Sequence, residues 1–120
     1  MIYMIDPDES VRRAAMRLLR AAGLPALDFA SAPEFLASVC PHDGDCLVID
    51  SHLPGMSGLE LQQHLGRTGV RLAVIFTSAM DDERIRRQAR EAGACGFFLK
   101  PFDGQALVDT INFALCGHRP

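Results

Sequence analysis

Carboxylate, hydroxyl and amine side chains stand at the ends of four apolar segments of the sequence. They are Asp6, Asp50, the pair Thr77 and Ser78, and Lys100. An aspartate can attack phosphorus only where the negative charge of the incoming oxygens is neutralised, and a Mg²⁺ ion held by carboxylates together with a nearby lysine can do this. A serine or threonine hydroxyl can then hydrogen-bond a phosphoryl oxygen. These residue types therefore predict a phosphoryl-acceptor site with a divalent metal.

The apolar segments have the length of strands and alternate with segments of helical periodicity. Three of them are continuous apolar runs, which is typical of strands buried on both faces of a parallel sheet. Alternating units of this kind predict an α/β fold, a doubly wound parallel sheet of five strands with five helices. In such folds the residues that follow the strands meet at one edge of the sheet. The predicted strands are 2–5, a weaker 26–30, 46–49, 72–77 and 96–99.

Serine and glycine residues mark the predicted helix boundaries. The segments that begin at Ser31 and Ser57 fit the S-x-x-E capping box, which satisfies free N–H groups at a helix start. Glycine is the residue that most often follows a helix end. Four glycines stand where the predicted helices should stop, and these are Gly23, Gly66, Gly93 and Gly117.

The composition indicates a single domain over residues 1–120. The chain carries 12 Lys and Arg against 15 Asp and Glu, a formal charge of -3, and 48% of its residues are hydrophobic. A balance so near neutral predicts no direct binding of nucleic acid or membrane lipid, and no apolar run approaches a membrane span. Because the start lacks a signal-peptide pattern, we expect a cytoplasmic protein. The widely spaced cysteines predict free, mostly packed thiols at Cys40, Cys46, Cys95 and Cys116.

Two other classes of site fit the sequence less well. A nucleotide or flavin site needs a loop that cradles phosphate, but the first predicted strand is followed by the acidic turn 6–9, and neither glycine-rich phosphate motif is present. A phosphohydrolase that uses Asp50 as its nucleophile is disfavoured because no acid stands two residues further on.

The region around Asp50 resembles the phosphorylation-site segment of bacterial two-component response-regulator receiver domains. Residues 47–61 read LVIDSHLPGMSGLEL, and four further segments agree with the family in order and spacing. The resemblance covers essentially the whole chain, is strongest to receivers of the nitrogen-fixation-regulator type, and implies their flavodoxin-like fold. The four segments are 5–12 (IDPDESVR), 76–79 (FTSA), 91–94 (EAGA) and 98–102 (FLKPF).

The resemblance implies a role for each residue of the site. Asp50 corresponds to the phosphoacceptor, and Asp6 to an acidic-pocket residue that helps hold Mg²⁺. His52 corresponds to the donor of a metal-binding backbone carbonyl, and Lys100 to the counter-charge of the phosphoryl group. The bond between Lys100 and Pro101 is then expected to be cis, which proline makes inexpensive.

The switch residues of the family also have counterparts. Counting back from Lys100 and forward from Asp50 favours Ser78 over Thr77 as the switch hydroxyl, and both remain candidates. Phe97 stands where the family keeps its rotating aromatic side chain.

One position departs from the family pattern. The family carries two adjacent acids after the first strand, and Pro7 occupies the second place, that of the acid expected to touch the metal. Proline offers neither a carboxylate nor an N–H group. Either Mg²⁺ is held more weakly by the remaining ligands and water, or Asp8 or Glu9 reaches into the site instead.

The resemblance also implies partners. A histidine kinase supplies the phosphoryl group and commonly meets the first helix, which here carries Arg12, Arg13, Arg17 and Arg20. The surface of the fourth helix, fifth strand and fifth helix mediates homodimer formation or contact with an output domain, and a C-terminal DNA-binding output domain would lie outside this sequence. The alternative is a pseudo-receiver, a module that docks without phosphorylation because of Pro7.

Overall fold

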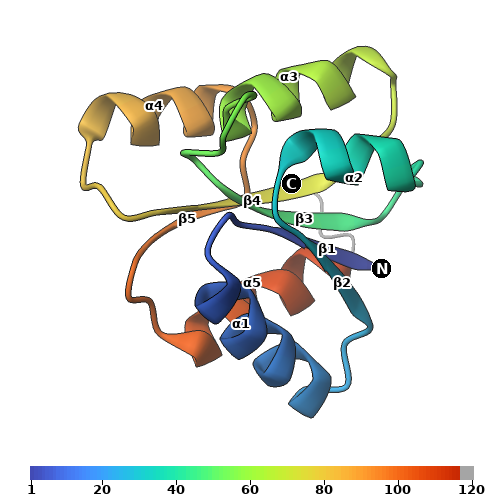
Figure 1. The fold of residues 1–120 in the computed structure, drawn as a ribbon, viewed down its shortest axis with the longest axis vertical. Coiled ribbons are helices and arrows are strands. Elements are labelled where there is room, and N and C mark those ends of the chain that lie inside the picture. Colours follow the sequence, from blue (N-terminus) through green and yellow to red (C-terminus); the bar gives the residue numbers. More distant parts are fainter. Residues whose placement is uncertain (117–120) are drawn as a thin grey trace.

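The computed structural model describes residues 1–116 and places a parallel sheet between two layers of helices (Figure 1). This arrangement confirms the predicted doubly wound α/β fold. The strands are β1 (Ile2–Ile5), β2 (Ala26–Phe29), β3 (Cys46–Asp50), β4 (Ala73–Ser78) and β5 (Gly96–Leu99). The helices are α1 (Glu9–Ala21), α2 (Ala32–Ser38), α3 (Gly58–Arg67), α4 (Glu83–Glu91) and α5 (Gly104–Leu115).

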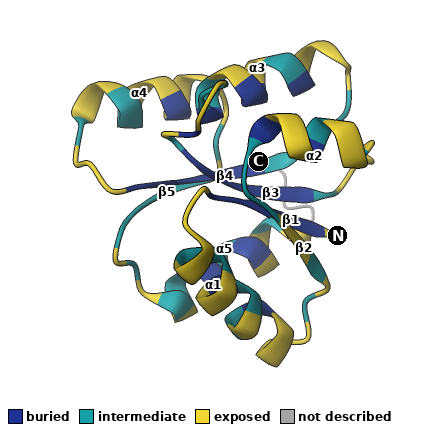
Figure 2. Ribbon diagram, in the orientation of Figure 1, coloured by how far each residue is buried: buried dark blue, intermediate teal, exposed yellow. Residues whose placement is uncertain are grey.

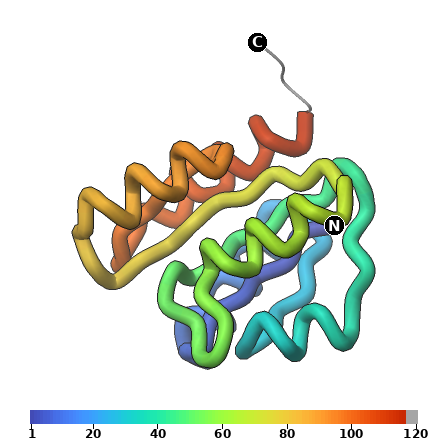
Figure 3. The backbone as a smooth tube through the Cα atoms, turned by 90° about the horizontal axis from the view of Figure 1, so that it is seen from above, coloured from blue at the N-terminus to red at the C-terminus, as the bar shows by residue number. Residues whose placement is uncertain are grey.

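The order of the strands across the sheet explains where a site can form. The order is β2-β1-β3-β4-β5, and every neighbouring pair is parallel. Helices α1 and α5 cover one face, while α2, α3 and α4 lie side by side on the other (Figures 1 and 3). The chain leaves β1 toward β2 on one side and returns to β3 on the other, so the crevice at their carboxyl ends is the point where such sheets bind ligands.

Two apolar clusters hold the layers together. Side chains of α1 and α5 pack against one face of the sheet, and side chains of α2, α3 and α4 pack against the other. The central strands β1, β3 and β4 are buried almost throughout, which agrees with their continuous apolar runs (Figure 2). Strand β2 lies at the sheet edge and exposes Leu27, which explains its weaker sequence signal.

The helix starts largely follow the predicted capping. Ser57 and Glu60 form a complete capping box at α3, since each side chain accepts from the backbone N–H of the other residue. At α2 the Ser31 hydroxyl accepts from the backbone N–H of Glu34 at 3.3 Å and also donates to the Glu34 carboxylate. Both serines are therefore N-caps.

The predicted helix ends are confirmed at two glycines and wrong at a third. Gly23 and Gly93 follow α1 and α4 with φ of 75° and 92°, a backbone conformation that favours glycine. Gly66 lies inside α3, and the turn after that helix is made by Gly69, whose φ is 81°. Gly117 lies outside the described residues.

The thiols are free, as predicted, but the prediction that most are packed is wrong. Cys46 is fully buried in β3, whereas Cys40, Cys95 and Cys116 are exposed. The exposed three lie outside strands and helices, where the apolar character of cysteine does not secure burial. Burial raises the pKa of the Cys46 thiol to about 12. Within residues 1–116, no helix has the length and apolar character needed to span a membrane.

Candidate functional site

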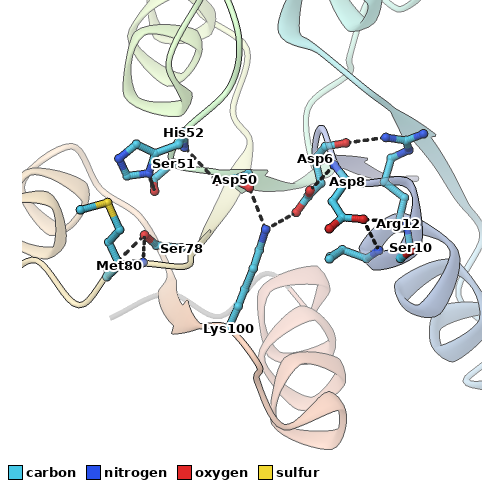
Figure 4. Close-up of polar contacts among 11 residues, drawn as sticks. Asp6, Asp8, Ser10, Arg12, Asp50, Ser51, His52, Ser78, Met80 and Lys100 are labelled. Atoms are coloured by element: carbon cyan, nitrogen blue, oxygen red, sulfur yellow. Dashed lines mark hydrogen bonds and ion pairs between the residues drawn. The ribbon is translucent and has the colours of Figure 1, made fainter.

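Lys100 bridges two aspartates at the carboxyl edge of the sheet (Figure 4). Its Nζ atom donates to Asp6 Oδ2 at 2.6 Å and to Asp50 Oδ2 at 2.7 Å. Asp6 follows β1, Asp50 ends β3 and Lys100 follows β5, so the lysine side chain crosses the end of β4 to reach both carboxylates. The structure thus brings together three of the side chains that the sequence predicted to meet.

The second oxygen of each carboxylate is held by the backbone. Asp6 Oδ1 accepts from the N–H of Asp8 at 2.8 Å, and Asp50 Oδ1 accepts from the N–H of His52 at 2.8 Å. Asp6 is fully buried and Asp50 is 7% exposed. Both carboxylates are therefore fixed in orientation before any ligand arrives.

Burial and the ion pairs act against each other on the protonation of the site. Burial raises the pKa of Asp6 above its ordinary value, although the hydrogen bonds from Lys100 and Asp8 oppose this effect. Burial alone would lower the pKa of Lys100, but its hydrogen bonds to Asp50 and Asp6 and their charges outweigh it and raise that pKa. Lys100 therefore stays charged at neutral pH.

The chain around Lys100 is tied to β4. The backbone N–H of Lys100 donates to the carbonyl of Ser78 at 2.8 Å. The peptide bond between Lys100 and Pro101 is cis, as expected from the resemblance.

The two candidate switch hydroxyls lie in different surroundings. The Ser78 hydroxyl accepts from the N–H of Met80 and donates to its carbonyl, both at 3.1 Å, so it contacts the loop between β4 and α4. Thr77 is fully buried, and within residues 1–116 its Oγ1 atom has no hydrogen-bond partner. Phe97 is half-buried in β5, and the Arg86 guanidinium lies 5.3 Å from its ring centre.

The acids at positions 8 and 9 do not contact the lysine. Pro7 is exposed, and Asp8 uses its carboxylate as the N-cap of α1, accepting from the N–H groups of Ser10 and Val11. Glu9 is exposed and pairs with Arg13 on the same helix. The position of the missing acid is therefore not filled by a neighbouring carboxylate in this structure.

The donor set suits a hard cation. Two carboxylates already converge on one positive charge, the Lys100 ammonium, and Mg²⁺ prefers oxygen ligands and retains several waters. Within residues 1–116, no three His, Cys, Asp or Glu side chains group in a way that could hold a metal by themselves. A metal here would have Asp6 and Asp50 as its carboxylate ligands and would need backbone or water oxygens to complete its shell.

Gly58 is a site residue that the sequence reasoning missed. A Cβ atom at this position would lie 2.6 Å from the backbone oxygen of Asp50 and 2.9 Å from the Phe76 ring. Glycine therefore lets the start of α3 pack directly on the backbone of Asp50. The signal was present as the glycine after Ser57, at the first position of the predicted helix.

Arg12 is a second missed residue. Three of the four arginines on α1 are exposed, but Arg12 turns inward and its Nη1 atom donates to the carbonyl of Asp6 at 2.7 Å. Spacing alone did not separate Arg12 from Arg13, Arg17 and Arg20.

Comparison with known proteins gives consistent matches. The family model described as "Response regulator receiver domain" matches residues 2–112. Nodulation protein W of Bradyrhizobium diazoefficiens is 37% identical over 110 residues, which cover 92% of this chain and 48% of that protein. The transcriptional regulatory protein FixJ of Azorhizobium caulinodans is 36% identical over 114 residues, 95% of this chain and 54% of that protein.

A solved structure agrees with the sequence matches. The response regulator StyR superposes with a TM-score of 0.88 at 39% identity, covering 96% of this chain and 58% of the other. The chain thus spans about half the length of the curated relatives it matches. From the fold, the site and these matches together, the chain belongs to the response regulator receiver domain family.

Proposed function

We propose that this domain accepts a phosphoryl group from a histidine kinase onto Asp50, with Mg²⁺, and changes conformation as a result. The observation that carries the proposal is the Lys100 ammonium, which lies 2.7 Å from Asp50 Oδ2 and 2.6 Å from Asp6 Oδ2. A nucleophilic carboxylate, a second acid and a fixed positive charge meet at one point, which is what phosphoryl transfer to an aspartate requires.

Each half-reaction is a phosphoryl transfer. A carboxylate oxygen of Asp50 forms a bond to phosphorus while the bond from phosphorus to the phosphohistidine nitrogen of the kinase breaks, and the leaving imidazole retains the electron pair. In the unphosphorylated protein Lys100 pairs with a carboxylate oxygen of Asp50. During transfer it pairs with the phosphoryl oxygens instead. Attack of water on phosphorus later releases phosphate and restores the Asp50 carboxylate.

The metal would be held by few protein groups. We assign Asp6, Asp50 and the backbone carbonyl of His52 as ligands, with water in the remaining positions. Bound Mg²⁺ supplies positive charge against the phosphoryl oxygens. Because Pro7 removes one acid and Asp8 caps α1, we expect weaker metal binding than in a receiver with both acids.

The conformational response would pass through β4 and β5. Ser78 now bonds the backbone of Met80, and we propose that its hydroxyl turns to a phosphoryl oxygen and draws the loop after β4 with it. Phe97 then changes position beneath Arg86. Phosphorylation thereby shifts the population between two conformers, and the surface of α4, β5 and α5 is the proposed place for a homodimer or an output domain.

The partners follow from the surface and the relatives. The exposed arginines of α1, Arg13, Arg17 and Arg20, form the proposed contact with the kinase. FixJ is a transcriptional regulatory protein and extends well beyond the region that this chain matches. We therefore propose that the domain controls a DNA-binding output domain in the full-length protein.

A second candidate is a docking module that works without phosphorylation. Pro7 removes an acid, and Lys100 alone already pairs with both Asp6 and Asp50. Because Lys100 already supplies a positive charge to both carboxylates, the unphosphorylated site needs no metal. This ion pairing favours the docking module.

Intact-protein mass after incubation with a small phosphodonor separates the two candidates. We expect a single phosphoryl adduct that requires Mg²⁺ and is lost in Asp50→Asn, with more adduct at low Mg²⁺ in Pro7→Asp. Absence of an adduct in the natural sequence at all Mg²⁺ concentrations, together with its appearance in Pro7→Asp, would support the docking module.

A further inference from the structure

We propose that Arg12 is a positioning residue, which holds Asp6 in place for the metal by bonding its backbone carbonyl. The inference deepens the proposed function and rests on the role given there to Asp6. It concerns a contact between α1 and the loop after β1, outside the set of residues that touch phosphate or metal.

The contacts of Arg12 are unusual for a helix-surface arginine. Its Nη1 atom donates to the Asp6 carbonyl at 2.7 Å, and its Nε atom donates to Asp28 Oδ2 at 3.0 Å. The side chain is only 16% exposed, whereas that of the next residue, Arg13, is 68% exposed. Figure 4 shows the Arg12 side chain pointing at the backbone of Asp6. Arg12 thus links α1 to the loop after β1 and to β2.

Asp6 is held at each of its polar atoms. Its N–H donates to the carbonyl of Phe29 at 3.1 Å, and its Oδ1 and Oδ2 accept from Asp8 and Lys100. The remaining atom, the carbonyl oxygen, accepts from Arg12. Among these four partners only Lys100 and Arg12 act through side chains, and Lys100 is shared with Asp50 and turns to the phosphoryl oxygens in the proposed transfer. Arg12 has no such second task at the site, so it is the side-chain partner dedicated to the position of Asp6.

Pro7 makes this contact more important. Proline has no N–H group, so residue 7 donates no hydrogen bond that could fix the turn after β1. With the second acid also missing, the metal depends on the position of Asp6 more than it would in a site with two acids. Partners that orient a metal ligand commonly change metal affinity by about 10–100-fold when removed.

Asp28 fixes the guanidinium in turn. A planar guanidinium holds its N–H donors in a set geometry and can serve two acceptors at once, which a lysine ammonium cannot reproduce at the same positions. Asp28 lies on the edge strand β2 and its side chain is 39% exposed, so Asp28→Asn is a mild change for folding. Asp28 should therefore act on the site only through Arg12.

The test compares Arg12→Ala, Arg12→Lys and Asp28→Asn with Arg13→Ala, an exposed arginine one residue away whose partner is Glu9 on the same helix. Mg²⁺ alone is titrated while amide resonances are followed by NMR. In the metal-free protein, hydrogen exchange of the Asp8 amide reports the position of Asp6 Oδ1, which that amide contacts at 2.8 Å.

We expect Arg12→Ala to weaken Mg²⁺ binding by about tenfold or more and to speed exchange of the Asp8 amide. Arg12→Lys should show the same weaker Mg²⁺ binding and faster Asp8 exchange. Asp28→Asn should show both changes to a smaller extent. The double variant should match Arg12→Ala alone, because Asp28 has no separate route to the site. At saturating Mg²⁺ the rate of phosphorylation of Arg12→Ala by a small phosphodonor should return to that of the unchanged protein. Arg13→Ala should leave Mg²⁺ affinity and Asp8 exchange unchanged.

The outcomes separate the two proposals. Normal Mg²⁺ affinity and normal Asp8 exchange in Arg12→Ala would overturn the positioning role, even with a lower melting temperature, since that would be a structural role only. Failure of the unchanged protein to bind Mg²⁺ would overturn the proposed function instead. In that case the Asp8 exchange of Arg12→Ala still decides whether Arg12 positions Asp6.

Discussion

Replacing Lys100 by methionine removes the ammonium that Asp6 and Asp50 both contact, while leaving a side chain of similar length. Lys100 is the only lysine in the sequence. Removing one partner of a buried ion pair typically costs about 3–5 kcal/mol, because the remaining charge is left without compensation. The Lys100 side chain is 17% exposed, so water can reach the site and the lower end of that range applies. We expect a loss of about 3 kcal/mol in the free energy of unfolding at pH 7.

The loss translates into a large shift of the melting temperature. An unfolding entropy of about 2.1 cal/mol/K per residue gives about 0.25 kcal/mol/K for this chain, and hence a fall of about 12 °C. Arg13→Ala, which removes an exposed pair with Glu9, should change the melting temperature by less than about 2 °C and serves as the control.

The stability of Lys100→Met should change with pH in a defined direction. Burial raises the pKa of Asp6, and without the opposing lysine that pKa rises further. The folded state then binds more protons than the unfolded state, so the stability of the variant falls as pH rises from the ordinary carboxyl value through the raised pKa. The gap between variant and unchanged protein, measured by urea unfolding, should therefore be smaller at pH 5 than at pH 7.5.

Added Mg²⁺ should recover part of the loss, since at 100 times its dissociation constant a ligand of the folded state contributes about 2.7 kcal/mol. A variant as stable as the unchanged protein at pH 7.5, or an equal loss at both pH values, would show that Lys100 does not stabilise buried charge on Asp6 and Asp50.

Three further outcomes are expected. Pro7→Asp should restore the missing acid and tighten Mg²⁺ binding by about tenfold, measured by calorimetry, and unchanged affinity would show that position 7 does not face the metal. Gly58→Ala should cost about 1–3 kcal/mol in urea unfolding because its Cβ would lie 2.6 Å from the backbone oxygen of Asp50, whereas Gly66→Ala, with open space around it inside α3, should be neutral or stabilising. In the folded protein a thiol reagent at pH 8 should modify the three exposed cysteines and spare Cys46, whose pKa is raised to about 12; fast modification of Cys46 would contradict its burial.

The sheet and its charged edge could be predicted because the order of strands and helices along the chain is compatible with few arrangements. Continuous apolar runs separated by helical segments predict parallel strands, and parallel strands with right-handed crossovers bring their carboxyl ends to one edge. Asp6, Asp50 and Lys100 follow or end three such strands, so their meeting follows from the order of the elements. Their roles remain proposals, but their proximity was expected.

The details that depend on side-chain packing could not be predicted from spacing. Arg12 and Arg13 are adjacent and identical in type, but only Arg12 faces the Asp28 carboxylate on β2 and the Asp6 carbonyl. Gly66 resembles a helix stop, but α3 ends one residue later, at Arg67, and Gly69 makes the turn with positive φ. The hydroxyl of Ser78 finds the backbone of Met80, a loop contact that no periodicity indicates.

The residue that carries the phosphoryl group decides whether Asp50 is the acceptor. The protein is treated with a small phosphodonor and Mg²⁺, the acyl phosphate is trapped by reduction, and the modified residue is identified by peptide mass mapping. We expect modification at Asp50, dependent on Mg²⁺ and reduced in Lys100→Met. Modification at any other residue, or an adduct that persists in Asp50→Asn, would contradict it.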